Sequence, residues 1–226
     1  FSTFYSRKNK DKLKYKFNGY SSIEYNHSQC YQDMFVLSML NGKTKGKYLE
    51  IGSAHPHFNS NTALLEEQFE WNGYSIDYNE EEVIKFGNKR NNPCILANAL
   101  EIDYSKLLDE INLGTNWDYL QLDCDPASNT YVILTSIPFN KYKFAVITYE
   151  HDYYCDETKI YRDKSRAYLQ SLGYELVVDN ISINEDSPFE DWWVHPELVD
   201  RTIIDKMKLV NGKTKKAEDY IFGLSK

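Results

Sequence analysis

Acidic residues gather at two places in the sequence where an apolar, strand-like run ends. Asp123 and Asp125 lie in the segment L-D-C-D-P, and Glu150 and His151 lie in the segment Y-E-H-D. Two such clusters on neighbouring strand ends can hold a hard divalent cation through oxygen ligands. In a metal-free site, Asp125 or His151 would instead serve as the general base. A cluster of solvated acids with no chemical role is the simpler alternative.

The elements that must position these residues follow from hydrophobic patterning. Strand-like and helix-like segments alternate along the chain, which is typical of a parallel α/β sheet. We therefore predict a Rossmann-like, doubly wound, mostly parallel seven-stranded sheet with helices on both faces. In such sheets ligands bind beyond the carboxyl ends of the strands. The expected strands are 47–51, 74–76, 94–97, 117–122, 144–149, 174–178 and 220–222, and the expected helices are 62–70, 80–89, 104–111, 130–136, 159–172 and 197–209.

The loop after the first expected strand begins like a phosphate-binding loop and then lacks its glycines. Gly52 ends the strand, and His-Pro-His at 55–57 occupies positions where a dinucleotide-binding loop has further glycines. Without them the backbone cannot approach two phosphates closely, which disfavours NAD, FAD and ATP. S-adenosylmethionine, a nucleoside without phosphate, fits better. Asp77 after the second strand is suited to a ribose diol, and Asn98 and Ala99 to an adenine edge.

Size and charge limit the classes of function. The chain has 226 residues and a formal net charge of −8, which argues against duplex nucleic acid as a partner. We expect a basic N-terminal arm at 1–25, with its cations concentrated at 7–16, followed by one domain at 26–226. The arm is either a solvated, mobile terminus or a surface for an anionic substrate such as a phosphorylated or nucleotide-linked sugar.

Compartment is predicted from the cysteines and from hydropathy. The four cysteines are scattered without a C-x-x-C pair, so reduced thiols in a cytoplasmic protein are expected. No apolar run is long enough to span a bilayer, so we expect no membrane span. The oligomeric state is left open by the sequence.

Four segments together resemble FkbM-like methyltransferases, a family of class I enzymes that use S-adenosylmethionine. They are S-Q-C-Y-Q-D-M-F at 28–35, Y-L-E-I-G at 48–52, S-N-T-x-x-L-E at 60–66 and W-N-G-Y-S-I-D-Y-N at 71–79. The resemblance covers roughly residues 26–180, and the joint order of the segments is more specific than any one of them. The His-Pro-His loop departs from the family, which usually has an acid and a glycine there.

The resemblance implies site residues as well as a fold. The two acidic segments together, D-x-D after the fourth strand and an acidic pair after the fifth, are also similar to macrocin-type metal-dependent sugar O-methyltransferases. In that family the first acid of D-x-D binds Mg²⁺ and the second is the base. Transferred by position, Asp123, Glu150 and His151 would hold Mg²⁺ or Mn²⁺, and Asp125 would be the base. The implied cofactor contacts are Gln32, Glu50, Gly52, Ser53, Asp77, Tyr78, Asn98, Ala99 and Asp123.

A late segment combines aromatic rings with acids. Residues 186–196 read D-S-P-F-E-D-W-W-V-H-P, with Trp192, Trp193 and His195 close together. The two indoles are either anchors of the hydrophobic core or a wall that stacks on a sugar face. The polar surroundings favour the second interpretation, so the three residues are expected substrate contacts.

These observations lead to an expected function. We expect an O-methyltransferase that acts on a hydroxyl of a sugar, a glycan or a natural-product precursor. The substrate is either a free small molecule or glycan, or one linked to a nucleotide or phosphate. Two alternatives stay open: a methyltransferase that acts on a nucleotide or RNA cap, and a nucleoside-binding module without turnover.

Overall fold

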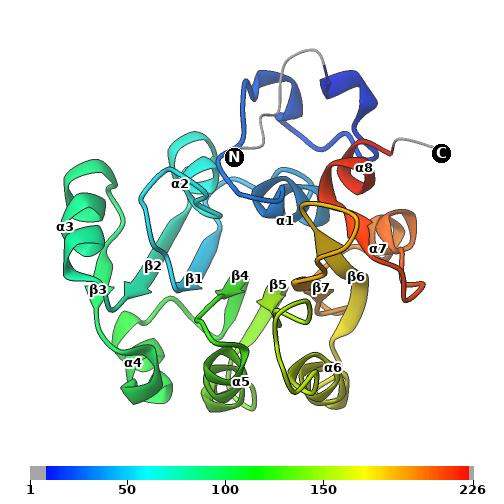
Figure 1. The fold of residues 1–226 in the computed structure, drawn as a ribbon. Helices are drawn as coiled ribbons and strands as arrows, with labels where there is room; N and C mark the ends of the chain where they lie inside the picture. Colours follow the sequence, from blue (N-terminus) through cyan, green and yellow to red (C-terminus); the bar gives the residue numbers. More distant parts are fainter. Residues whose placement is uncertain (1–8, 224–226) are drawn as a thin grey trace.

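The computed structural model describes residues 9–223, and its centre is one eight-stranded sheet (Figure 1). The strand order is β3-β2-β1-β4-β5-β7-β6-β8. All pairings are parallel except those of β7, which runs antiparallel to β5 and β6. The strands are β1 Lys47–Ile51, β2 Asn72–Asp77, β3 Cys94–Leu96, β4 Asn116–Leu122, β5 Lys143–Glu150, β6 Glu175–Ser182, β7 Glu190–Val194 and β8 Lys215–Lys216.

Helices cover the sheet on both faces, and each face has its own hydrophobic core. Helices α4, α5 and α6 lie on one side of the sheet, and α1, α2, α7 and α8 lie on the other (Figure 1). None of the helices within residues 9–223 has the length and apolar character needed to cross a bilayer. The helices are α1 Gln32–Met39, α2 Ala63–Phe69, α3 Glu80–Lys89, α4 Tyr104–Ile111, α5 Ala127–Ser136, α6 Tyr161–Ser171, α7 Arg201–Met207 and α8 Ala217–Phe222.

The predicted fold class is confirmed, with two corrections near the C-terminus. The sheet has eight strands rather than seven, and the segment expected as the strand 220–222 belongs to helix α8. Acidic residues in the first turn of α8 favour a helix, as does Gly223 in the left-handed conformation at its end. Two strands were missed, β7 and the two-residue β8. All five residues of β7 are buried, so this strand lacks the alternating pattern of a half-exposed strand.

The N-terminal segment packs onto the domain along the part that the structure describes. Leu13, Phe17 and Ile23 are buried in the same core as α1 and α8. The backbone N–H of Lys14 donates to the carbonyl of Ile221 at 2.9 Å. Residues 9–25 are therefore part of the domain in the structure, and the first part of the expected basic arm lies outside the described residues.

Strand register aligns the ends at which the candidate site lies. Ile51 at the end of β1 pairs with Ile76 of β2 and with Leu122 of β4, and Leu122 pairs in turn with Tyr149 of β5. The order of strands reverses between β1 and β4, which is where ligands bind in doubly wound sheets. Because β7 is antiparallel, its first residue, Glu190, reaches this same edge.

Candidate functional site

A cavity of about 570 Å³ opens at the carboxyl ends of β1 to β4. Six of the expected cofactor contacts line it together, although they come from four separate segments of the chain. A volume of this size is within the range for a nucleoside-sized ligand. The lining residues are Gly52, Ala54, Ile76, Asp77, Tyr78, Ala97, Asn98, Ala99, Leu100, Asp123, Cys124, Asp125, Asn129 and Ile133.

Gly52 allows the loops after β1 and β4 to touch. Its φ is +84°, a conformation that favours glycine, and a Cβ added there would lie 1.7 Å from the carbonyl oxygen of Asp123. The backbone N–H of Asp123 also donates to the carbonyl of Ile51 at 3.1 Å. No other residue type fits this position without moving the backbone. The glycine therefore brings the loop after β1 against Asp123.

Asp77 is held in the cavity wall by two backbone groups. Its Oδ2 accepts from the N–H of Ala54 at 2.7 Å, and its Oδ1 accepts from the N–H of Asn79 at 2.8 Å. Each carboxylate oxygen can accept more than one hydrogen bond, so Asp77 can still bind a diol. Tyr78, next to it, is 82% exposed and offers an aromatic face at the rim of the cavity.

Three other expected cofactor contacts lie outside the cavity lining. Glu50 is buried and accepts hydrogen bonds from Ser75 at 2.6 Å and Thr62 at 3.0 Å. Burial raises the pKa of Glu50 to about 7. Ser53 contacts the thiol of Cys94. The assignment of Glu50 as a direct contact is corrected, because its carboxyl is used within the protein to join β1, β2 and the start of α2.

Gln32 also serves an internal role. Its Oε1 accepts from the N–H of Cys30 at 2.8 Å, and its Nε2 donates to Glu190 at 3.4 Å. The side chain is buried and joins the first turn of α1 to β7 rather than lining the cavity. The side-chain amide of Gln32 therefore holds Glu190 of β7 rather than a ligand in the larger cavity.

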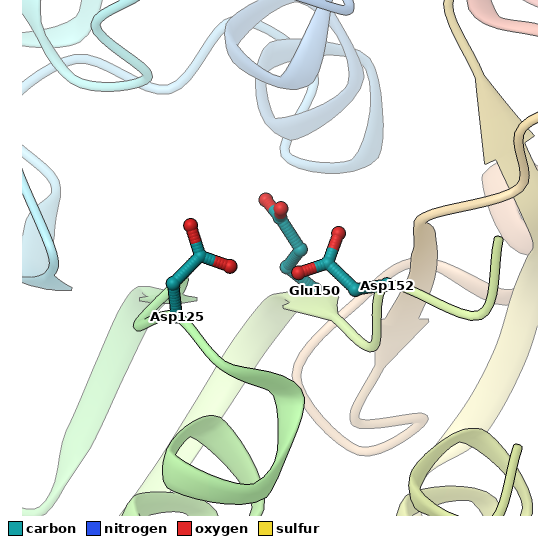
Figure 2. A group of neighbouring side chains, drawn as sticks. All are labelled: Asp125, Glu150 and Asp152. Carbon is teal, nitrogen blue, oxygen red and sulfur yellow. The ribbon is translucent and has the colours of Figure 1, made fainter. Parts of the chain in front are cut away.

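Three carboxylates converge beside this cavity, as Figure 2 shows for Asp125, Glu150 and Asp152. One oxygen from each lies within 4.8 Å of the others. Asp125 comes from the loop after β4, and the other two come from the end of β5. We call these three residues the acid cluster. Asp125 is exposed, whereas Asp152 is buried.

The pKa values in and beside the acid cluster show the cost of crowding carboxylates. Burial, with contributions from the neighbouring acids, raises the pKa of Asp152 to about 7 and that of Asp123 to about 6. The same causes raise the pKa of Glu150 well above its usual value. Burial also raises the pKa of Glu190, opposite Glu150 on β7, to about 8. Such groups need protons or a cation between them.

A second, smaller cavity of about 190 Å³ lies on the other side of the acid cluster. Glu150 and Asp152 line it, whereas Asp123 and Asp125 line the larger cavity. The carboxylates are therefore at the boundary between two ligand-sized spaces. The remaining lining residues of the smaller cavity are Gln29, Tyr154, Ile183, Asn184, Ser187 and Phe189.

His151 is not available to either cavity, which corrects its assignments as base and as metal ligand. Its side chain is fully buried, and its Nε2 lies 3.4 Å from Asp191 of β7. Its Nδ1 accepts from the N–H of Tyr153 at 3.1 Å. Glu150 and Asp152 both reach the acid cluster, whereas His151 between them points toward Asp191. In the acid cluster, Asp125 and Asp152 lie beside Glu150, in place of Asp123 and His151, which the resemblance implied as metal ligands.

Trp192 and Trp193 belong to the core, so their assignment to a substrate wall is wrong. Both are fully buried in β7, on opposite faces of the sheet. Trp192 stacks on Phe35 with ring centroids 4.5 Å apart, and its indole N–H donates to Glu190. A burial this complete leaves no face for a sugar. Glu190 and Asp191, which made the indoles look exposed, are themselves buried with internal partners.

His195 lies at the wrong edge of the sheet for a substrate contact. Its backbone N–H donates to the carbonyl of Ala145, near the start of β5, and its ring packs against Tyr174 with centroids 5.0 Å apart. The acid cluster is at the end of β5. The antiparallel direction of β7 thus places Glu190 at the site and His195 far from it.

Replacing Trp193 with alanine is expected to lower the free energy of unfolding by about 3–5 kcal/mol, the usual cost of emptying a buried aromatic site. Chemical denaturation of the purified variant measures this change. Exposed Tyr78→Ala is the control and should leave stability nearly unchanged. A Trp193→Ala protein of wild-type stability would contradict the core assignment.

Comparisons with known proteins bear on the fold. No protein-family model matches the chain, and no curated protein matches it in sequence. Among solved structures, a Clostridium thermocellum protein described as an rRNA-methylase superposes with a TM-score of 0.51 at 11% identity, covering 75% of this chain and 95% of that one. An Aquifex aeolicus S-adenosylmethionine-dependent methyltransferase has a TM-score of 0.48 at 14% identity, covering 75% of this chain and 94% of that one.

Identities this low establish the architecture alone. The protein has the Rossmann-like fold of class I methyltransferases, with the antiparallel β7 inserted between β5 and β6. The function of this protein depends on its own cavities and side chains.

Proposed function

We propose that the protein is an S-adenosylmethionine-dependent O-methyltransferase of the FkbM-like kind, which methylates a hydroxyl of a sugar or glycan precursor. One observation carries the proposal: the acid cluster lies at the boundary between the larger and the smaller cavity. A carboxylate in that place can take a proton from an acceptor in one space while a methyl donor occupies the other. Methyl transfer needs this arrangement, because the enzyme must align the hydroxyl and remove its proton.

The larger cavity is chemically suited to S-adenosylmethionine. No lysine, arginine or histidine is among its lining residues, whereas three aspartates are. A di- or triphosphate would meet only repulsion there, but a sulfonium cation would not. Asp77 would hold the ribose diol, and Asn98 and Tyr78 would border the adenine. When bound, S-adenosylmethionine supplies a methyl group that is already activated for transfer.

The smaller cavity is suited to the end of a polyhydroxylated acceptor. Asn184 and Ser187 contribute polar groups to its lining, and Phe189 and Tyr154 contribute aromatic surface. This combination of amide, hydroxyl and ring is typical of sites that hold a sugar. Its volume of about 190 Å³ is small, so only the reacting end of the acceptor would enter.

Asp125 is the residue that we propose as general base. It lines the cofactor cavity, it is exposed, and it belongs to the acid cluster. Oxygens of Asp125, Glu150 and Asp152 also fit Mg²⁺ or Mn²⁺, which prefer carboxylate ligands. A cation held there would lower the pKa of the acceptor hydroxyl. Each residue contributes one oxygen to the close group, so Asp125 keeps a second oxygen for the proton.

RNA is a less favoured acceptor. The structural neighbour from Clostridium thermocellum is described as an rRNA-methylase, so RNA is the second candidate acceptor. The chain itself has a net charge of −8, and Glu150 and Asp152 line the smaller cavity. Both features oppose a polyphosphate backbone close to the reacting group. A nucleoside-binding module without turnover would have no use for the acid cluster.

Asp77→Asn is expected to weaken S-adenosylmethionine binding about 10- to 100-fold, since a hydrogen bond to a charged group contributes roughly 1.5–3 kcal/mol. Calorimetric titration measures the affinity. Asp200→Asn is the matched control, because Asp200 also accepts a backbone N–H bond at a helix start but lies far from the cavity. Wild-type affinity in Asp77→Asn would remove the ribose contact.

Turnover itself is tested by following S-adenosylhomocysteine release with a panel of sugars and sugar derivatives. Release that depends on one class of hydroxyl-bearing acceptor supports the proposal. If S-adenosylmethionine binds but no acceptor causes S-adenosylhomocysteine release, the protein would instead be a nucleoside-binding module without turnover.

A further inference from the structure

The loop and helix that follow the acid cluster carry cationic side chains beside tyrosine rings, in a stretch that also contains Asp156, Glu157 and Asp163. Tyr154 lines the smaller cavity, and the chain then runs into the first turn of α6. Cationic side chains and tyrosine rings alternate over this stretch. We call them the cationic–aromatic surface: Lys159, Arg162 and Lys164 with Tyr131, Tyr153 and Tyr161.

Tyr153 organises the part of the cationic–aromatic surface nearest the acid cluster. The guanidinium of Arg162 lies 3.6 Å from the centroid of the Tyr153 ring, and Nζ of Lys159 lies 4.9 Å from it. Lys159 also donates to the carbonyl of Tyr153. The N–H of Tyr153 donates in turn to His151. These cations are therefore tied to the segment that carries Asp152.

Lys164 is held between two further rings. Its Nζ lies 5.8 Å from the centroid of Tyr131 on α5 and 5.5 Å from that of Tyr161 on α6. Among residues 9–223, neither Lys164 nor Lys159 forms an ion pair with a carboxylate, whereas Arg162 contacts Asp163. Two exposed ammonium groups are thus positioned by aromatic contacts while their charge is left for a ligand.

The charges of this region are arranged in two parts. Both cavities are lined by acids, so an anionic group cannot enter them at low cost. The cationic–aromatic surface begins where the smaller cavity ends, at Tyr153 and Tyr154. An acceptor that suits both parts has a neutral, hydroxyl-bearing end and a negatively charged end.

We propose that the cationic–aromatic surface binds the phosphate group of a phosphate-linked sugar acceptor, a sugar phosphate or a nucleotide sugar, whose sugar end enters the smaller cavity. This inference rests on the proposed function and narrows its substrate class. Lys159 and Lys164 contact the phosphate as exposed point charges, and Arg162 contributes its guanidinium from the same side. The alternative source of phosphate, an RNA strand, becomes an outcome of the test.

The experiment compares four probes by calorimetric titration: glucose, glucose 1-phosphate, uridine diphosphate glucose and a short RNA. S-adenosylhomocysteine is kept at saturation, and EDTA removes divalent cations so that no metal can bridge phosphate to the acid cluster. We expect both phosphorylated probes to bind at least about tenfold more tightly than glucose, because two exposed charge contacts together contribute about this factor. Stronger binding of the nucleotide sugar would identify the nucleotide as the source; equal binding would identify the sugar phosphate.

The test variant is the double substitution Lys159→Gln and Lys164→Gln, which should abolish that tenfold preference and leave S-adenosylhomocysteine affinity unchanged. Lys206→Gln is the matched control: its Nζ lies 5.3 Å from the Tyr15 ring, but α7 packs at the opposite edge of the sheet. The inference is overturned if the double variant still binds the phosphorylated probes about tenfold more tightly than glucose. It is also overturned if the wild type lacks this preference, or if the wild type binds the short RNA more tightly than the phosphorylated sugars. Failure of S-adenosylhomocysteine to bind would overturn the proposed function itself.

Discussion

Asp125→Asn is expected to lower kcat by roughly 10²–10⁴, the usual contribution of a positioned general base. The amide keeps the shape of the side chain but cannot accept the proton of the acceptor hydroxyl. Asp125 is exposed, so thermal stability should change little. The affinity for S-adenosylmethionine should also persist, because Asp77 and the cavity walls are untouched. Steady-state kinetics with a responsive acceptor measures the effect.

The control for this variant is Asp205→Asn, an exposed acid paired with Arg201 at the far edge of the sheet. It should have wild-type kcat. Wild-type turnover in Asp125→Asn would contradict the assignment of the base and shift the role to Asp152, the neighbouring acid that also lines a cavity.

The second large effect concerns pH and divalent cations. Burial raises the pKa of Asp123 to about 6 and that of Asp152 to about 7, both above the unfolded values. The folded protein therefore binds these protons more tightly than the unfolded chain, and stability falls as pH rises from about 4 to about 7. In EDTA, we expect the unfolding midpoint to fall by about 5 °C between pH 5.5 and pH 8, from a loss on the order of 1–2 kcal/mol.

Mg²⁺ or Mn²⁺ should reverse that loss at pH 8 and have little effect at pH 5.5, where protons already occupy the cluster. Activity should follow the same rule. Turnover that requires an ionised Asp152 should fall in metal-free solution as pH drops through about 7, the pKa to which burial raises that carboxyl, and added metal should extend activity to lower pH. Differential scanning calorimetry and pH–rate profiles with and without EDTA check both effects. Full activity in EDTA together with no cation-dependent midpoint would rule out the metal.

Much of the sheet and of the cofactor cavity was predictable from local patterns. The bounds of β1, α3 and α4 agree with the sequence, because short apolar runs and capping residues such as Asn79 and Asp103 set them. Gly52 and Asp77 were identifiable since each ends a strand, and strand ends of a parallel sheet meet at one edge. Such features depend on neighbours in the chain.

The acceptor side was less predictable because it depends on pairing between distant segments. Nothing local marks β7 as a central strand, since Glu190 and Asp191 look solvated until Gln32 and Arg166 are placed beside them. The choice between His151 and Asp152 depended on the backbone past the end of β5, where Asp152 adopts a left-handed conformation. The E-x-D spacing of Glu150 and Asp152 was the available signal, equal to the D-x-D spacing after β4.

The two cavities draw on different stretches of the chain. Every residue that lines the larger cavity falls between Gly52 and Ile133, whereas the smaller one is built from 150–189 with Gln29 as the exception. Under the proposed function, methyl-donor binding and acceptor choice are therefore encoded by consecutive parts of the chain. Recombination downstream of α5 could replace the residues that line the smaller cavity, and with them the acceptor specificity, while the residues that line the larger cavity stay unchanged. Chimaeras joined between α5 and β5 offer a route to new acceptor specificities in this scaffold.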